Sequence, residues 1–318
     1  MDDAITKSFS VIIPVYNSQN TLSFLITRLE KVLTATSKSY EVILVNDCSL
    51  DDSWSVICEM SHKFSWIKGI NLMRNFGQHN ALLCGIRQAK YDAIITMDDD
   101  LQHPPEEIPK LIDKLNEGFD VVYGSPNKLP HSLIRNVLSL ITKRVLALVM
   151  RIRRVRDISA FRIFRTRLRN AFDRYQNPGV ILDVLLSWGT TRFASVKVDE
   201  FPRMDGKSNY SFSKLVSTTF LILTGFSTAP LKFASWLGFS FTLFGLVIFL
   251  YVLIAYITAG SIPGFPFLAS IISIFSGIQL FTLGIFGEYL GRIFTRNMER
   301  PVYVINHLVE NGKVRTQD

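Results

Sequence analysis

Three consecutive carboxylates, Asp98, Asp99 and Asp100, follow directly after an apolar run at 93–97. Like charges at one strand end disfavour one another's ionisation, and a divalent cation relieves that conflict. Asp98 and Asp100 can point to the same side of an extended chain, and Gln102 offers an amide oxygen one step further. Such oxygen ligands suit Mg²⁺ or Mn²⁺, which bind one or two carboxylates together with substrate phosphates. The pattern favours a metal site over a solvated acidic loop.

A second polar cluster, at 46–49, also follows an apolar run. Its Asp47 could accept hydrogen bonds from a nucleobase or a ribose hydroxyl. Taken alone, a carboxylate that precedes a helix is more often a helix cap.

The elements that must position these carboxylates alternate between strands and helices. Apolar runs predict strands at 9–15, 41–45, 66–72, 93–97 and 119–123, and helical spacing predicts helices at 21–33, about 51–62, 78–89 and from 104 onward. This alternation predicts a parallel sheet covered by helices on both faces. Such sheets bind ligands at the carboxyl ends of their strands, where Asn17 and the clusters at 46–49 and 98–102 fall.

Beyond residue 130 the pattern is less regular. Residues 132–150 repeat apolar side chains at helical spacing with basic residues between them. This is typical either of a helix in a membrane interface or of a helix packed on a core. Further strands are predicted at 159–164 and 192–198, helices near 166–174 and 178–188, and an amphipathic stretch at 212–226.

No Lys, Arg, Asp or Glu occurs from Phe233 to Gly287. Two spans in this block, 233–258 and 265–287, are each long enough to cross a hydrocarbon core, which takes about 20 residues. They predict a transmembrane hairpin. Its connecting turn is uncharged, whereas Lys232 precedes it and Arg292, Arg296 and Arg300 follow it. The positive-inside rule therefore predicts that both termini and the catalytic region face the cytoplasm.

The 318-residue chain carries a formal net charge of +8. Arginines at 151–156 stand beside an apolar stretch, which favours anionic lipid or phosphorylated ligands over nucleic acid. The three cysteines have no metal-ligand spacing and indicate a reducing compartment.

The polar clusters form part of a larger set of motifs. The set comprises Val11–Asn17, Val45–Asp51, Arg74–Gly77 with Gly85, Asp98–Pro104, Asp157 before Phe161 and Arg162, and Arg203 with Gly206 before Ser208. Together these motifs resemble glycosyltransferase family 2 over nearly the whole chain. With the two apolar spans, the chain resembles the polyprenyl-phosphate glycosyltransferases, meaning bacterial GtrB-type glucosyltransferases and, more distantly, dolichol-phosphate mannose synthase. Ser18 stands where the family often has Glu, and Asn209, two residues after Lys207, where it often has Lys.

The resemblance implies an α/β architecture of the GT-A, Rossmann-like kind, with interfacial helices and a two-helix transmembrane hairpin. The expected organisation is a cytoplasmic catalytic domain at 1–210 that includes an interfacial helix at about 132–150, a juxtamembrane amphipathic helix at 211–230, two transmembrane helices within 231–290, and a cytoplasmic tail at 291–318.

Roles for individual residues are also implied by the resemblance. The donor nucleotide would be bound by Pro14, Tyr16, Val45, Asp47, Asp98 and Arg203, and Mg²⁺ or Mn²⁺ by Asp98, Asp100 and Gln102. Asp100 and Arg203 would act on the diphosphate, and Asp157 would face the acceptor as a base or an orienting group. A phosphate monoester is largely dianionic near neutral pH, so it hardly needs a base. Its charge could be bound by the arginines at 151–156, Arg162 and Arg165.

The implied reaction is an inverting transfer of a hexose, with glucose from UDP-glucose first, to polyprenyl (undecaprenyl-type) phosphate at the cytoplasmic face of the plasma membrane. GDP-mannose, UDP-galactose, UDP-N-acetylglucosamine and UDP-aminoarabinose remain alternative donors, and a homo-oligomer is compatible with the sequence. A processive synthase would carry a Gln-x-x-Arg-Trp motif and more spans, and neither is present. A non-catalytic membrane scaffold is disfavoured by the intact acidic pair, Asp157 and Arg203.

Overall fold

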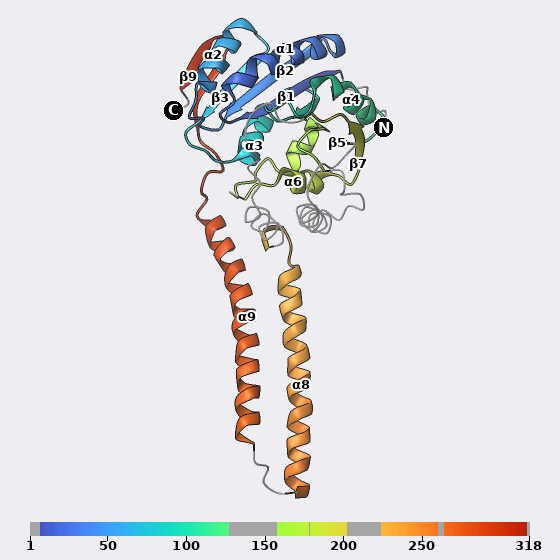
Figure 1. Ribbon diagram of the computed structural model, residues 1–318, viewed down its shortest axis with the longest axis vertical. Coiled ribbons are helices and arrows are strands. Elements are labelled where there is room, and N and C mark those ends of the chain that lie inside the picture. The colour runs from blue at the N-terminus through green and yellow to red at the C-terminus, as the bar shows by residue number, and fades with distance from the viewer. Residues whose placement is uncertain (1–6, 127–157, 178, 202–223, 260–263, 317–318) are drawn as a thin grey trace. The chain divides into compact units, whose positions relative to one another are not determined.

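The computed structural model describes residues 7–126, 158–177, 179–201, 224–259 and 264–316 (Figure 1). The chain divides into two compact units, Met1–Ser217 with Arg300–Asp318, and Thr218–Glu299. Several sequence-predicted features lie outside the described residues: the helix at 132–150, the arginines at 151–156, most of the juxtamembrane stretch, Asp157, Arg203, Lys207 and Asn209.

The first unit contains a nine-stranded mixed sheet with the order β7-β5-β6-β4-β1-β2-β3-β8-β9 among the described residues. The strands are β1 Ser8–Val15, β2 Ser39–Asn46, β3 Ile67–Leu72, β4 Ala93–Thr96, β5 Val121–Pro126, β6 Arg162–Arg165, β7 Phe193–Val198, β8 Ile305–Glu310 and β9 Lys313–Thr316. β1 pairs in parallel with β2 and β4 at the centre. From Phe9 to Val15 every residue of β1 is buried, as expected for a strand covered on both faces.

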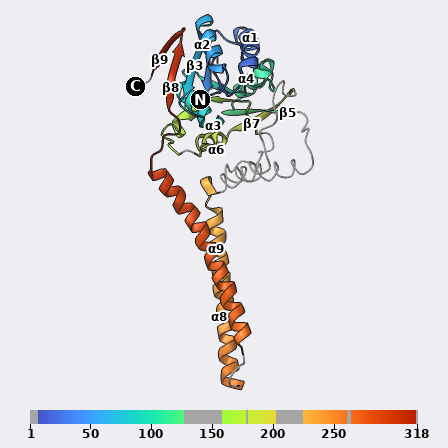
Figure 2. The same cartoon turned by 60° about the vertical axis from the view of Figure 1, so that its left-hand side comes forward.

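Helices cover both faces of this sheet. They are α1 Gln19–Thr36, α2 Ser53–Lys63, α3 Gln78–Gln88, α4 Ile108–Asn116 and α6 Leu182–Gly189, with 3₁₀ turns at Pro105–Glu107 and Thr166–Ala171. Figures 1 and 2 show α1, α2 and α4 along one face and α3 and α6 along the other. Side chains of α1, such as Leu22 and Leu29, pack with Val11 and Ile13 in the main core.

Helix α3 lies very close to the opposite face of the sheet. A Cβ at Gly85 would come within 2.5 Å of Ile12 Cγ2 and 3.2 Å of Val45 Cγ2. Only glycine permits this approach, which fixes the height of α3 above β1 and β2 and therefore the position of the loop that precedes α3.

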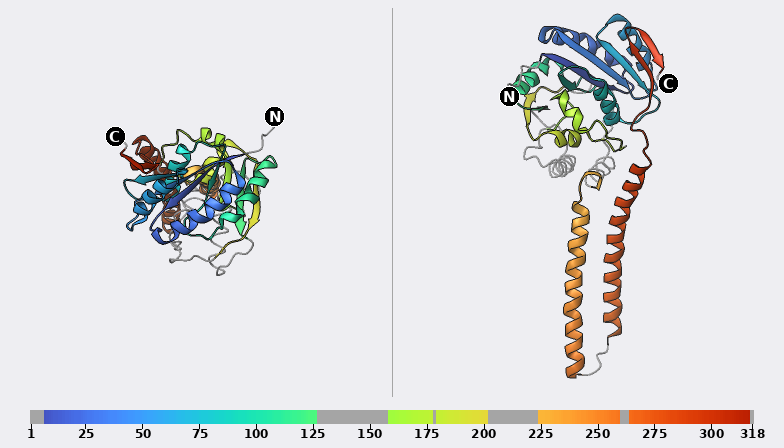
Figure 3. Two further views of the ribbon diagram at one scale, coloured as in Figure 1. Left: turned by 90° about the horizontal axis from the view of Figure 1, so that it is seen from above. Right: turned by 180° about the vertical axis from the view of Figure 1, so that it is seen from behind.

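Two features of the predicted sheet are wrong. It is not wholly parallel, because β6 lies antiparallel between β4 and β5. The stretch expected to be a tail instead forms β8 and β9, and β8 pairs antiparallel with β3 (Figure 3). The burial of Val309 against Gly69 explains this placement, because a Cβ at Gly69 would lie 2.6 Å from Val309 Cγ1. Such a distant partner is invisible in local periodicity.

The second unit contains two long apolar helices, α8 Ala229–Ala259 and α9 Phe265–Asn297. Each includes a segment long and apolar enough to cross a membrane by length and composition, Ala229–Thr258 with mean hydropathy 2.4 and Ile274–Asn297 with 1.2. The helices contact each other where Phe241 and Phe275 meet edge to face, with ring centroids 6.0 Å apart. The helices fall where the sequence predicted them, and α9 continues past Gly287.

Candidate active site

The predicted polar clusters meet at the carboxyl edge of the central strands. The register pairs Val15 with Asn46 and Ile12 with Thr96, so β1, β2 and β4 deliver their following loops to one edge. The backbone ladder continues one step beyond the strands, because Asp47 N donates to Val15 O at 2.9 Å and Met97 N to Ile12 O at 3.3 Å. The loops are therefore fixed where they leave the sheet.

The three acidic side chains after β4 point to different partners. Asp98 Oδ1 accepts a hydrogen bond from Gln78 Nε2 at 2.6 Å, and Asp100 Oδ1 accepts one from the backbone N–H of Gln102 at 3.2 Å. Next to them, the buried Leu101 has φ +60°, a left-handed conformation that costs energy for a branched residue. This strained turn brings the backbone of Gln102 back to Asp100.

Asp99 is turned toward the loop after β1. Its Oδ2 accepts hydrogen bonds from the backbone N–H of Tyr16 at 3.1 Å and from the Ser18 hydroxyl. Burial raises the pKa of Asp99, the hydrogen bonds from Ser18 and Tyr16 lower it, and the charge of Asp100 raises it again. A glutamate at position 18 would place another carboxylate beside Asp99, so serine is the compatible residue in this chain.

Asp47 holds the loop that leads into α3. Its two carboxylate oxygens accept hydrogen bonds from the backbone N–H groups of Phe76, at 2.7 Å, and Gly77, at 2.8 Å. Burial raises the pKa of Asp47, and these two bonds lower it in part. The α2 N-cap is Asp52, so the alternative of a cap on α2 is wrong for Asp47. Asp47 therefore has a structural role, because it fixes the loop before α3. A contact between Asp47 and a nucleoside would be a second role of the same side chain.

The remaining residues predicted for the nucleoside differ in accessibility. Tyr16 is 43% exposed at the end of β1. Pro14 and Val45 are buried in their strands, and Val45 packs beneath α3. Their side chains therefore serve the core. Two further apolar side chains, Leu50 and Met73, are exposed in the loops that follow β2 and β3, and the sequence predicted no role for either side chain.

The loop that follows β4, residues 98–103 and called the acidic loop below, also contacts the segment before β6. The ring of His103 stacks on Phe161 with centroids 5.4 Å apart, and His103 Nε2 lies 3.5 Å from the hydroxyl of Ser159. Gln102 O accepts a hydrogen bond from Phe201 N at 2.8 Å. The loop that carries the predicted metal ligands is thus joined to the chain that follows Asp157 in sequence.

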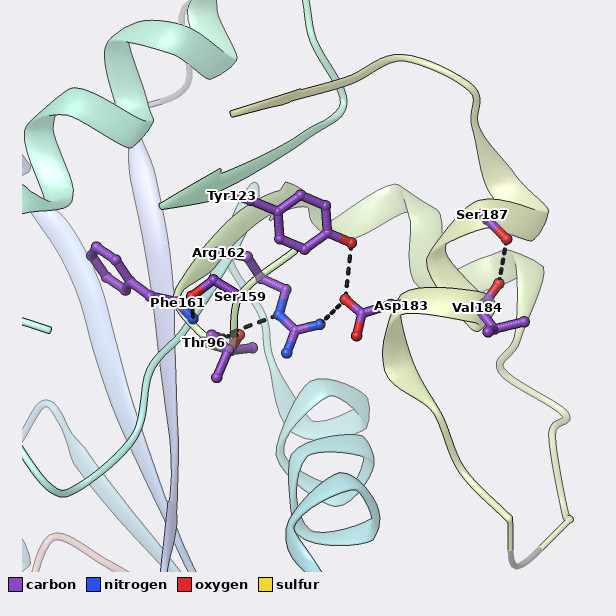
Figure 4. A network of polar contacts seen from close by, with 9 residues as sticks. Thr96, Tyr123, Ser159, Phe161, Arg162, Asp183, Val184 and Ser187 are labelled. Carbon is purple, nitrogen blue, oxygen red and sulfur yellow. Dashed lines mark hydrogen bonds and ion pairs between the residues drawn. The ribbon is translucent and has the colours of Figure 1, made fainter. Parts of the chain in front are cut away.

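Two arginines predicted to bind the lipid phosphate form ion pairs, Arg162 as a buried residue and Arg165 as a half-buried one. The guanidinium of Arg162 contacts the carboxylate of Asp183 in α6 (Figure 4), and Arg162 is only 2% exposed. Arg165 Nε lies 3.6 Å from the carboxylate of Asp120. The prediction is wrong for Arg162, because a buried guanidinium already bound to a carboxylate is not presented to a lipid.

A divalent cation fits the acidic loop through a small ligand set. Among the described residues, no group of three or more His, Cys, Asp or Glu side chains gathers as a metal cluster. Asp98, Asp100 and Gln102 offer two carboxylates and an amide on one short loop, with Asp99 directed elsewhere. Mg²⁺ in particular is commonly bound by one or two carboxylates, with substrate phosphates completing its shell.

The acidic loop lies at the carboxyl edge of the parallel strands β1, β2 and β4 in a helix-covered mixed sheet, and enzymes of the α/β class bind their ligands at that edge. The chain belongs to glycosyltransferase family 2, whose family model, Glycosyl transferase family 2, matches residues 10–175. The catalytic unit therefore has the GT-A fold.

Relatives of this chain are similar over nearly its full length. An uncharacterized glycosyltransferase of Synechocystis sp. is 32% identical over 96% of this chain and 96% of its own. An undecaprenyl-phosphate 4-deoxy-4-formamido-L-arabinose transferase of Enterobacter sp. is 32% identical over 99% of this chain and 97% of its own. A solved structure of a mycobacterial protein is 15% identical with a TM-score of 0.50, and it covers 69% of this chain and 73% of that one. This last likeness concerns the fold alone.

The metal ligands predicted on the acidic loop give the first testable prediction. EDTA should abolish binding of UDP to the full-length protein in detergent, and added Mn²⁺ or Mg²⁺ should restore it. Asp100→Ala should weaken UDP binding in Mn²⁺ by at least about tenfold, because it removes a carboxylate ligand. Isothermal titration calorimetry measures both effects, with Asp113→Ala on the exposed side of α4 as the matched control. Unchanged UDP affinity in EDTA would exclude the metal role.

Proposed function

We propose that this chain transfers a sugar from a UDP-linked donor to undecaprenyl phosphate, with inversion at the anomeric carbon. The observation that carries the proposal is the full-length similarity to an undecaprenyl-phosphate sugar transferase. The geometry supports it, because the acidic loop suited to a diphosphate and its cation contacts the segment that follows the proposed acceptor residue Asp157. The two apolar helices suit an enzyme whose acceptor is a lipid.

In this reaction an acceptor phosphate oxygen attacks the anomeric carbon while the bond from that carbon to the UDP oxygen breaks. Asp98, Asp100 and Gln102 would hold Mg²⁺ or Mn²⁺, which neutralises the departing diphosphate when bound. Asp47 holds the 74–77 loop, and Tyr16 offers an exposed ring to the nucleoside. Arg203 is proposed to bind the diphosphate. Since the nucleophile is already largely dianionic, Asp157 orients the acceptor or the arginines around it.

A donor screen tests the function directly. Purified full-length enzyme with undecaprenyl phosphate and Mn²⁺ should release UDP from UDP-glucose or from UDP-4-deoxy-4-formamido-L-arabinose. The first is the donor that the sequence resemblance favours, and the second is the sugar in the relative's name. GDP-mannose, UDP-galactose and UDP-N-acetylglucosamine complete the screen. Release of nucleotide that does not depend on undecaprenyl phosphate, or release of GDP alone, would contradict the proposal.

The acceptor role of Asp157 predicts a split between turnover and donor binding. Asp157→Asn keeps the size of the side chain but removes its charge, so lipid-dependent turnover should fall at least about 100-fold, as for a misplaced reactant. UDP affinity should stay within about twofold, because Asp100 and Asp47 belong to the donor side. Asp113→Asn on α4 is the control. Loss of UDP affinity together with turnover would move Asp157 to the donor site.

We further propose that α8 and α9 cross the plasma membrane with both chain ends in the cytoplasm. The support is the uncharged stretch between them, against Lys232 on one side and Arg292, Arg296 and Arg300 on the other.

This orientation is testable by labelling intact cells with an impermeant thiol reagent. Cys48, Cys58 and Cys84 are first replaced by alanine, and Ser261→Cys or Asn311→Cys is added. Ser261→Cys should be labelled on intact cells, and Asn311→Cys, in the exposed turn of the C-terminal hairpin, only after lysis. The reverse pattern would overturn the orientation.

A further inference from the structure

A single backbone carbonyl, that of Ala160, accepts hydrogen bonds from two side chains. Thr96 Oγ1, at the end of β4, donates a hydrogen bond to it at 2.8 Å. Arg162 Nε donates a second at 3.3 Å. Thr96 lies two residues before Asp98, so this carbonyl joins the strand that carries the acidic loop to the chain that carries Asp157.

The Arg162 guanidinium is itself fixed by a buried cluster. It contacts the carboxylate of Asp183, whose Oδ1 also accepts the hydroxyl hydrogen of Tyr123 at 2.9 Å. All three side chains are nearly inaccessible, at 2%, 6% and 3% exposed for Arg162, Asp183 and Tyr123. Taking two charges out of water costs several kcal/mol per ion, so a buried pair is weak evidence for stability. What it does supply is a fixed direction for the guanidinium.

Phe161, the residue after Ala160, is packed against β5 and the acidic loop. Phe161 O accepts a hydrogen bond from Gly124 N at 2.9 Å, and a Cβ at Gly124 would lie 2.6 Å from the Phe161 ring. The same ring also stacks on His103 of the acidic loop. Residues 159–161 are thus held by β4, by β5 and by the acidic loop at once.

We propose that the cluster formed by Arg162, Asp183 and Tyr123 is a positioning device for the acceptor side of the site. It fixes the Ala160 carbonyl, and with it the chain entering β6, at a set distance from the acidic loop. Asp157 precedes this anchored segment by two residues. This inference rests on the proposed function, since it assigns the cluster to the approach of acceptor to donor.

The test replaces both charges together, because removing one alone leaves the other buried without a partner. In the double variant Arg162→Met with Asp183→Leu, kcat for transfer to undecaprenyl phosphate should fall at least about tenfold. The dissociation constant of UDP with Mn²⁺ should stay within about twofold. Hydrogen exchange of peptides covering 158–161 should become faster. Tyr123→Phe keeps the ion pair and is the milder change. It should lower kcat and speed up hydrogen exchange by a smaller factor than the double variant, with UDP affinity again within about twofold.

Glu41→Gln is the matched control. Glu41 is also a buried carboxylate with hydrogen-bond partners, Ser10 and Lys90 N, but it lies at the amino-terminal edge of the sheet. For the Glu41→Gln variant, kcat, the UDP affinity and hydrogen exchange at 158–161 should match those of the unaltered protein.

The outcomes separate the two proposals. Unchanged kcat and exchange in both network variants would show that the cluster only fills the core, and weaker UDP binding in parallel with kcat would assign it to the donor site; either result overturns the inference. If the double variant does not fold, Tyr123→Phe decides by the same criteria. If the unaltered protein transfers nothing to undecaprenyl phosphate, the proposed function fails, whereas the exchange measurement still tests the positioning.

Discussion

Parallel pairing of β1 with β2 and with β4 is the constraint on which the site depends. Because parallel strands end at the same edge, the pairing of Val15 with Asn46 and of Ile12 with Thr96 decides where three separate loops emerge. A slip of one residue would turn each side chain of β1 to the opposite face of the sheet, so that Ile12 would leave Gly85 of α3 and face α1. The full burial of β1 on both faces makes such a slip costly, so the edge geometry is set by the core.

Crowding of negative charge is the consequence of this convergence, and the structure distributes it among different partners. Asp99 is satisfied by Tyr16 and Ser18, and Asp47 by the backbone before α3. Asp98 and Asp100 accept hydrogen bonds from Gln78 and from the backbone of Gln102. Hydrogen bonds do not remove the negative charge of carboxylates, so a diphosphate would approach this edge most favourably together with a cation. The proposed metal dependence rests on this concentration of charge.

Local pattern predicted the central part of the fold well. The strand predictions at 9–15, 41–45, 66–72 and 93–97 fall on β1 to β4, because continuous apolar runs between helices are typical of buried parallel strands. The strand β6 was also expected, but its antiparallel direction depends on contacts with β4 and β5 that no short stretch encodes. The segment predicted as a helix at 166–174 is a 3₁₀ turn over Thr166–Ala171.

The site was predictable at the level of loops and less so at the level of side chains. The positions of the strand ends indicated the acidic loop and Asp47. The hydrogen bonds that Asp47 accepts, however, come from Phe76 and Gly77, in a loop that begins 29 residues later. Arg162 resembled a phosphate ligand because of its place near Asp157. Its true partner, Asp183, stands 21 residues further on, and burial rather than sequence position decides the role.

The last two strands have a consequence for the order in which the protein is made. β3 borders β8, which leaves the ribosome only after both apolar helices have been synthesised. At 5–20 residues per second, the roughly 230 residues between them take on the order of 10 to 50 s. During that interval β3 is an unpaired edge strand of an incomplete sheet, while α8 and α9 would insert into the membrane. A fragment cut before α8 would keep that edge permanently, so a soluble catalytic fragment should carry residues 300–318 grafted back onto it.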